Sequence, residues 1–362
     1  MLLPQSVEEL VAIVHDHDQI QIVGARSKPA MTPPSGDAVR CGTTRLCGII
    51  SHEPSEFLIT AWAGTTIAEL RDTLASHGQY LPFDPPLADP GATIGGTVAA
   101  GLSGAGRLRF GGLRDFIVGV RIVDGLGNHV TGGGNVVKNA AGYDLPKLMV
   151  GSGGYLGAIT DVTLKVFPQP RSRITFHWKC KSFAAAIALQ TSLSQSPIDI
   201  AALDVEPNGS VWIRIEGEST ATDGVRDRLI RLQRQIDAPG DVTIVADASD
   251  VWKPLDDGSF SPPPNRLVRA VITPSKMCEI DRSLGELCVD RRYSVAGNVV
   301  WIDWPGERPI KMLDECLLHH GAPATVLTGT VPRYRLGVRG DRQMIANVKT
   351  ALDPNHRFVG QP

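Results

Sequence analysis

The chain lacks the cysteine pattern of a metal-cluster protein. It has six cysteines in 362 residues, none forms a CxxC pair, and the closest two are Cys41 and Cys47. Iron–sulfur and zinc sites normally use more tightly spaced ligands. We therefore interpret the cysteines as reduced and mostly buried thiols and predict no metal site. Any electron-transfer role must then rest on a different redox group.

Neither a large net charge nor a long apolar run is present. The 36 Lys and Arg residues nearly balance the 38 Asp and Glu residues, giving a formal net charge of −2. This balance argues against nucleic acid or an anionic membrane as the main partner, because either would require a strongly basic surface. No apolar run reaches the length of a membrane span, and the start "MLLPQSVEEL" lacks the features of a signal peptide. We expect a cytoplasmic protein with no transmembrane segment.

The first half of the chain carries helix and strand signals in turn. Ser6 and Thr66 are each followed three residues later by Glu and then by apolar residues at helical spacing, which predicts two helix starts. Strands are expected near residues 20–23, 58–63 and 159–166, with a hairpin from Val118 that turns at "DGLGN".

A break in the pattern at "PQPRSR", from Pro168, suggests a domain boundary. Beyond it, strands are expected near residues 198–205, 211–215, 267–272 and 294–302, and helices near 183–190, 225–236 and 277–287, followed by a last helix. This alternation favours an antiparallel sheet with helices on one face. At 362 residues the chain is long enough for two domains.

The most unusual stretch is "GATIGGTVAAGLSG", residues 91–104, in which five of fourteen residues are glycine. A proline-rich loop precedes it, so it is not a Rossmann turn, which follows a strand. Small residues allow a backbone to lie against a ligand, and Thr93, Thr97 and Ser103 add hydroxyl groups. Residue chemistry alone leaves two interpretations open: a phosphate or cofactor cradle, and a tightly packed helix of small residues.

A second glycine-dense run, residues 135–168, favours the cofactor cradle over the packed helix. Taken together, "PGATIGGTVAAGLSG", "RDFIVGV", "VVKNAAGYDLPKLMVGS" and "GYLGAITDVTLKV" resemble the PCMH-type FAD-binding domain of the vanillyl-alcohol-oxidase superfamily. Within it, the likeness is to the FAD-binding E subunits of bacterial glycolate oxidases. The resemblance is strong over residues 1–168 and loose beyond them.

The resemblance implies an α+β fold. A two-subdomain PCMH-type FAD-binding domain, residues 1–168, would enclose an extended FAD. An α+β cap domain with an antiparallel sheet, residues 169–330, would follow. Residues 331–362, whose "DPNHRFVGQP" is similar to the family's closing segment, would pack back on the FAD domain.

The resemblance also implies the cofactor site. A first phosphate loop would lie at residues 24–28, and a long loop at residues 90–103 would follow the pyrophosphate and ribityl chain as far as the isoalloxazine. The implied FAD-binding residues are Gly24, Ser27, Lys28, Pro90, Gly91, Ala92, Thr93, Ile94, Gly95, Gly96, Thr97, Gly101, Ser103, Arg114, Asp115, Lys138, Gly142, Tyr143, Asp144, Gly157 and Ile159.

The first loop departs from the family pattern. Members usually read like "RGGGSK", whereas this chain reads "VGARSK", with Ala25 and Arg26 in place of two glycines. A positive φ at either position would cost about 1 kcal/mol or more, although Arg26 would bring a positive charge to the pyrophosphate. The loop has no His or Cys where covalently flavinylated members carry one, so we expect non-covalent FAD.

A substrate site is not evident. Related 2-hydroxy acid dehydrogenases carry a "GDGNxH"-like element with metal-binding histidines, and its nearest counterpart, "VAGNVVWID" at residues 295–303, has Val300 at the histidine position. His319 and His320 are interpreted as a surface helix end. Arg107, Arg109 and Arg114 form a basic cluster that would meet a carboxylate or the FAD phosphates, or face solvent. We find no acid–base pair and predict no catalytic residue.

These observations lead to one functional hypothesis and two alternatives. The resemblance implies a subunit that relays electrons from glycolate, or another 2-hydroxy acid, oxidised in a sister FAD subunit, towards an iron–sulfur subunit. Such a complex would associate with a membrane only through its partner subunits. The alternatives are an autonomous FAD-dependent 2-hydroxy acid dehydrogenase and a scaffold subunit that has lost its flavin.

Overall fold

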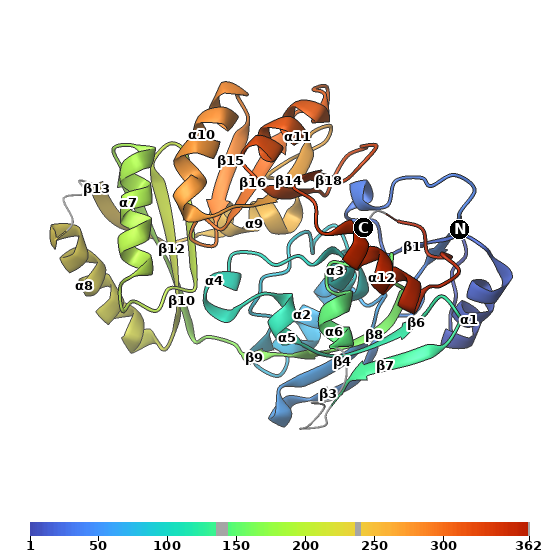
Figure 1. Ribbon diagram of the computed structural model, residues 1–362. Helices are drawn as coiled ribbons and strands as arrows, with labels where there is room; N and C mark the ends of the chain where they lie inside the picture. The colour runs from blue at the N-terminus through green and yellow to red at the C-terminus, as the bar shows by residue number, and fades with distance from the viewer. Residues whose placement is uncertain (135–143, 236–239, 361–362) are drawn as a thin grey trace.

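The computed structural model describes residues 1–134, 144–235 and 240–360. Within them the chain forms two α+β parts, and Figure 1 shows the first part on one side and the second above and beside it. No helix in these ranges is both long and apolar enough to cross a bilayer. The α+β class and the antiparallel sheets predicted from the sequence are confirmed.

The first part is built on a five-stranded antiparallel sheet of order β3-β4-β8-β6-β7. Its strands are β3 (Ile49–Glu53), β4 (Leu58–Trp62), β6 (Ile117–Val123), β7 (His129–Gly133) and β8 (Ala158–Lys165). Helices α2 (Ile67–Ala75), α3 (Ile94–Ala100), α4 (Arg107–Phe110), α5 (Leu113–Phe116) and α6 (Leu145–Met149) accompany it, with 3-10 turns η1 (Pro29–Met31) and η2 (Pro54–Glu56). Ile59, Val120 and Val162 of the sheet pack with Ile94 and Val98 of α3 in one apolar core.

A smaller unit joins the two ends of the described chain. Helix α1 (Val7–Asp16) packs beside a parallel pair, β1 (Ile20–Val23) and β2 (Val39–Gly42). The backbone of Ile20 exchanges hydrogen bonds with residues after helix α12 (Arg342–Leu352): its N–H donates to Arg357 O, and its carbonyl accepts from Val359 N. A short pair, β5 (Gln79–Tyr80) and β9 (Phe167–Pro168), lies where the chain leaves the first part.

The second part is a nine-stranded antiparallel sheet of order β13-β10-β12-β11-β15-β16-β14-β17-β18. Its strands are β10 (Ser172–Cys180), β11 (Ala202–Val205), β12 (Ser210–Gly217), β13 (Gly240–Val245), β14 (Arg266–Val271), β15 (Asp290–Ser294), β16 (Val299–Trp304), β17 (Pro323–Val326) and β18 (Arg335–Gly337). Its helices are α7 (Phe183–Ser194), α8 (Ser219–Gln235), α9 (Ser249–Asp257), α10 (Met277–Glu286) and α11 (Ile310–His319), with the turn η3 (Pro274–Lys276). Figure 1 places α7, α8, α10 and α11 on the side away from the first part.

The two predicted helix starts are confirmed. The Ser6 hydroxyl accepts a hydrogen bond from Glu9 N at 3.2 Å, and the Thr66 hydroxyl accepts one from Glu69 N at 3.1 Å. Each satisfies one of the N–H groups that a helix leaves without a partner in its first turn.

Several sequence-based boundaries were wrong. Strand β11 begins at Ala202 rather than at residue 198, and strands β17 and β18 with a second late helix were missed. Strands of three or four residues are too short to show a two-residue period. The long loop inferred for residues 90–103 is also not a loop throughout, because Thr93 caps helix α3.

Charged contacts join the two parts. Asp84 pairs with Arg214, whose side chain is buried. The Arg71 guanidinium donates to both carboxylate oxygens of Asp256, at 2.7 and 3.1 Å. Deeper in the second part, Arg292 pairs at 2.7 Å with the fully buried Asp204.

Candidate functional site: an FAD cavity and an arginine-lined cavity

The glycine-rich stretch lines a cavity in the first part. The wall is formed by the loop after β1, by helix α3 and by the turn before β8. The lining residues are Ile22, Gly24, Ala25, Arg26, Ser27, Lys28, Met31, Thr32, Thr43, Ala63, Thr93, Gly95, Gly96, Ala99, Ala100, Gly153, Gly154, Gly157 and Ile159. Most of these side chains are small, so the cavity is bounded largely by backbone.

Two glycines explain why helix α3 can lie so close to its neighbours. A Cβ on Gly95 would lie 2.6 Å from Ala63 Cβ, and Gly95 N donates to Ala63 O at 2.8 Å. A Cβ on Gly24 would lie 2.8 Å from Thr93 Oγ1. The structure thus combines the two interpretations left open by the sequence: a packed helix of small residues forms one wall of a cradle.

Lys28 is the charged group of this cavity that matters most for an anionic ligand. Its side chain is only 7% exposed, and its one hydrogen bond within the described residues is a donation from Nζ to Ser27 Oγ at 3.1 Å. Burial without a carboxylate lowers the pKa of Lys28 to about 8. A buried ammonium without a counter-ion fits the pyrophosphate of FAD, because an anion supplies the missing charge.

The altered first loop contains a left-handed residue. Arg26 has φ 61°, whereas Ala25 is not among the residues with positive φ. Of the two residues that replace glycine, Arg26 therefore stands at a position where the backbone favours glycine. In the same cavity, the buried Thr32 Oγ1 has no hydrogen-bond partner among the described residues. A ligand in the cavity would satisfy this hydroxyl.

A second cavity of about 280 Å³ shares Met31 and Ala100 with the first. It lies between the two parts, and its lining residues are Met31, Ala100, Gly101, Ser103, Arg107, Gly112, Leu113, Arg114, Asp115, Val150, Gly151, Arg269, Thr325, Tyr334 and Arg335. Four of them are arginines. The single acid, Asp115, already accepts a hydrogen bond from Gly112 N at 2.8 Å.

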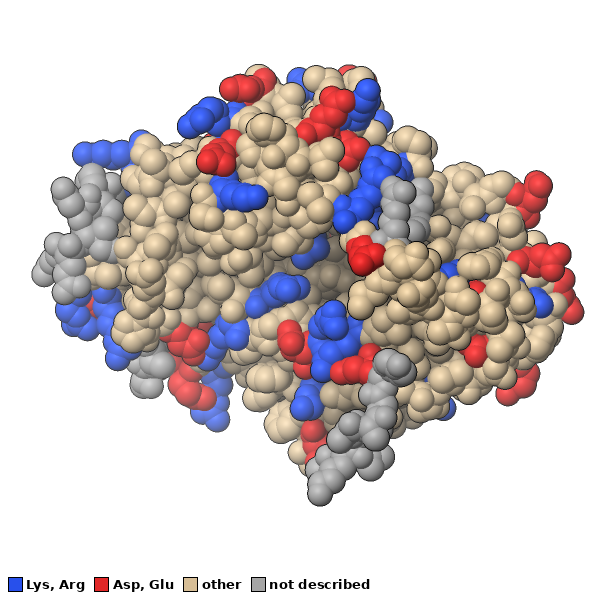
Figure 2. Space-filling view, in the orientation of Figure 1, with Lys and Arg blue, Asp and Glu red and all other residues tan. Residues whose placement is uncertain are grey.

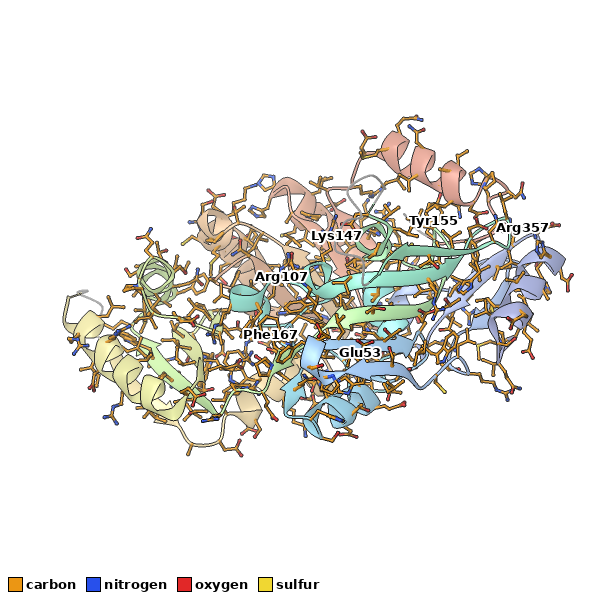
Figure 3. The ribbon with its side chains drawn as sticks, turned by 90° about the horizontal axis from the view of Figure 1, so that it is seen from below. Glu53, Arg107, Lys147, Tyr155, Phe167 and Arg357 are labelled. Carbon is orange, nitrogen blue, oxygen red and sulfur yellow. The ribbon has the colours of Figure 1, made fainter. Side chains whose placement is uncertain are left out.

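Within the described residues, none of the four arginines of this second cavity forms an ion pair. Among the described residues Arg269 has no ion pair, and its buried Nε has no hydrogen-bond partner. Burial, together with repulsion from Arg107, lowers the pKa of Arg269 to about 10. Arg335 donates instead to the backbone oxygen of Gly151 at 3.1 Å. Figure 3 shows Arg107 between the two parts, and Figure 2 shows basic side chains around the central depression.

The described lining of this second cavity has one carboxylate, Asp115, as a proton acceptor. It contains no histidine, and burial raises the pKa of Tyr334. No cluster of three or more His, Cys, Asp or Glu that could hold a metal occurs in residues 1–134, 144–235 and 240–360. The arrangement is suited to bind an anion, and Asp115, its one described carboxylate, already accepts a hydrogen bond from Gly112 N.

The structure divides the predicted FAD-binding residues into four groups. Gly24, Ser27, Lys28, Thr93, Gly95, Gly96, Gly157 and Ile159 line the first cavity. Gly101, Ser103, Arg114 and Asp115 line the second. Pro90, Gly91, Ala92, Ile94, Thr97 and Asp144 line neither cavity; Ile94 is in the core, and Asp144 caps α6. Lys138, Gly142 and Tyr143 lie outside the described residues.

Several lining residues were missed by sequence reasoning. Gly153 and Gly154 belong to the "GSGG" run, which could have been included on its glycine density alone. Arg269, Thr325 and Arg335 come from the second part and carry no local signal.

Two segments considered for a substrate site, residues 295–303 and the pair His319 and His320, do not line either cavity. Residues 295–297 form the turn between β15 and β16, where Gln190 Nε2 donates to Ala296 O at 3.1 Å. His319 ends α11, as predicted, and His320 Nε2 lies 2.9 Å from Ser283 Oγ. Arg109, grouped with Arg107 and Arg114 by sequence, points to a different partner, Asp199.

Comparisons with known proteins agree with this geometry. Residues 1–133 match the family model described as FAD binding domain. The chain is 38% identical to glycolate oxidase subunit GlcE of Escherichia coli (strain K12), over 62% of this chain and 63% of that protein. It is 30% identical to a D-lactate dehydrogenase of Anaerostipes hadrus, over 47% of this chain and 36% of that one. The chain thus spans less than two thirds of the length of either relative.

A solved structure shows the same fold at low sequence identity. An alkyldihydroxyacetonephosphate synthase superposes with a TM-score of 0.73 at 18% identity, covering 99% of this chain and 76% of that one. The fold likeness therefore extends over both parts of the chain. The family model matched by residues 1–133 is that of an FAD binding domain, and the buried cation of the first cavity fits FAD as the cofactor.

Proposed function

We propose that this chain is an FAD-binding subunit of a glycolate oxidase-type complex and relays electrons from a sister flavoprotein subunit to an iron–sulfur subunit. The observation that carries the proposal is the cationic second cavity, which adjoins the first cavity and whose described lining has four arginines against one carboxylate, Asp115. FAD supplies one- and two-electron redox chemistry when it is bound. The likeness to a protein named as a glycolate oxidase subunit supports a role within a complex.

The residues of the first cavity would hold FAD without a covalent bond. Lys28 and Ser27 would face its phosphates, and Gly24, Gly95 and Gly96 would let the cofactor approach the backbone. No His or Cys occurs among the described residues that line this cavity, which supports non-covalent binding. Acid precipitation of the purified holoprotein should therefore release all of its flavin into the supernatant.

The second cavity favours electron transfer over oxidation of a hydroxy acid. Removing hydride equivalents from an alcohol also requires a group that takes the hydroxyl proton. Arginines cannot serve, because even Arg269, with its pKa lowered to about 10, stays protonated at neutral pH. Asp115, the one carboxylate of the described lining, is already engaged by Gly112 N. Four positive charges beside a redox cofactor make its uptake of electrons more favourable.

A second candidate function uses the same arginines. A carboxylate substrate would find its charge partner at Arg107, Arg269 and Arg335, as an autonomous 2-hydroxy acid dehydrogenase requires. The test is anaerobic mixing of the isolated holoprotein with glycolate or D-lactate. The relay predicts no bleaching of the flavin absorption until the sister subunit is added, and bleaching by the isolated chain would establish the dehydrogenase instead.

A flavin-free scaffold is the third possibility. The uncompensated Lys28 argues against it, because a buried cation without an anionic ligand is costly to retain. Visible absorption of the purified chain, before and after incubation with FAD, separates the scaffold from the other two functions.

A further inference from the structure

An open groove of about 850 Å³ leads from the second cavity to the surface. The two share Val150, Gly151, Arg269, Thr325 and Arg335. The groove runs between helix α6 and the following turn on one side and the strands β14 and β17 on the other, and helix α12 contributes to its outer end. Its inner end therefore lies beside the proposed redox site.

All the charged side chains in the described lining of this groove are positive. Its described lining includes Arg269, Arg333, Arg335 and Arg339 but no Asp, Glu or Lys. Within the part of the chain that the structure describes, only Arg333 of these four has a carboxylate partner, Asp314, at 2.6 Å. The groove is thus locally cationic on a chain whose formal net charge is −2, and it is complementary to acidic groups.

Apolar side chains are exposed along the same groove. Val271 is 40% exposed and Val338 is 43% exposed, and both belong to its lining. These side chains come from separate segments of the chain, so the fold assembles them into one surface. Apolar residues surrounded by arginines are typical of protein interfaces.

We propose that this groove is the docking surface for the sister flavoprotein subunit, which inserts a segment with acidic side chains between apolar ones. The inference rests on the proposed function and names where that partner binds. Docking here would place the partner next to the arginine-lined cavity and so shorten the path that electrons travel. A second copy of this chain fits less well, because its own groove is cationic and would repel another.

The test is capture of the co-expressed sister subunit by the affinity-tagged holoprotein. The groove variant is Val338→Glu/Arg339→Glu, which changes two exposed residues outside both cavities. The matched control is Leu318→Glu/Arg282→Glu, which makes the same changes at exposed positions on α11 and α10. Flavin absorption and thermal melting verify that both variants are folded and loaded.

The proposal expects the control to capture as much sister subunit as the wild type, and the groove variant to capture at least roughly tenfold less. Capture by the wild type should also weaken when salt is raised from about 50 to about 200 mM. Alongside the capture assay, sedimentation of the tagged chain alone measures whether the chain associates with itself.

Three results would overturn the proposal. Equal capture by the groove variant would reject this docking surface while leaving the proposed function intact. A self-association of the chain that the groove variant abolishes would show that a second copy occupies the groove. Failure of the wild type to capture the sister subunit would reject both the docking surface and the proposed function.

Discussion

The ammonium group of Lys349 lies 2.5 Å from Oδ2 of Asp353, and both side chains are buried. The same Nζ donates to the backbone oxygens of Tyr155 and Phe358, each at 2.6 Å. One side chain thus ties helix α12 to the turn before β8 and to the segment that pairs with β1. Figure 3 shows Tyr155 below this helix.

Replacing Lys349 with Met should strongly destabilise the protein, because it leaves the Asp353 carboxylate buried without its cation. We expect a loss of about 3–5 kcal/mol in the free energy of unfolding, measured by urea denaturation. The control is Lys311→Met, which removes an exposed ion pair with Glu315 and should cost under about 1 kcal/mol. Similar losses in the two variants would contradict this account.

Lys28 should make FAD affinity depend on pH. In the flavin-free protein the pKa of Lys28 is about 8, below the usual 10.5. The ammonium that meets FAD is therefore mostly charged only below about pH 8. The dissociation constant for FAD should stay flat below that pH and rise by up to about tenfold per unit above it. Fluorescence titration of the apoprotein measures this profile.

The variant Lys28→Met should bind FAD roughly tenfold to a hundredfold more weakly at pH 7, with no rise above pH 8. Lys181→Met, at an exposed position, should behave as the wild type. The apoprotein itself should gain stability as pH rises from about 8 to 10.5, since the unfolded chain then binds more protons than the folded one. An unchanged pH profile in Lys28→Met would show that another group titrates.

The variant Gly95→Ala should both destabilise the fold and weaken FAD binding. The added Cβ would lie 2.6 Å from Ala63 Cβ and 2.9 Å from Ala63 O, so α3 must shift away from the sheet. Overpacking of this kind costs about 1–3 kcal/mol. Gly224→Ala is the control, because its helical Cβ meets nothing within 4 Å and should raise stability by up to about 1 kcal/mol. A melting temperature unchanged by Gly95→Ala would disprove the close packing.

Two arginines at the interior of the second part, Arg292 and Arg269, should respond differently to removal. Arg292→Met leaves Asp204, which is fully buried, without its cation and should cost about 3–5 kcal/mol. Arg269→Met removes a cation that has no carboxylate partner among the described residues, so stability should change by under about 1 kcal/mol or increase. Denaturant melts of the two flavin-free variants test the difference, and equal losses would mean that Arg269 has a structural partner.

Local signals in the sequence predicted much of the fold. Ser6 and Thr66 reach N–H groups three residues ahead, so their role is decided within one turn. Strand β1 was also predicted at the observed residues, Ile20–Val23, as a short apolar run before the loop rich in Gly, Pro and Ser. Short strands such as β18 are formed by pairing with distant strands, and no local pattern marks them.

The residues of the candidate site also fall into those that the local sequence predicted and those that only the fold brings together. Residues of the glycine-rich stretch, such as Gly95 and Gly96, were recognisable because backbone approach to a ligand requires small residues. Arg269 and Arg335 were not, because an arginine on a strand is ordinarily a surface residue. Only the packing of the second part against the first brings them beside Arg107.

The pairing of β1 with the segment around Phe358 also constrains the order of events in the cell. A ribosome makes α1 and β1 first, whereas Arg357 and Val359, which bond to Ile20, follow only after the entire nine-stranded sheet has been synthesised. At about 5–20 residues per second, that delay lasts many seconds. The second part therefore has time to fold before the pairing of Ile20 with Arg357 and Val359 can form.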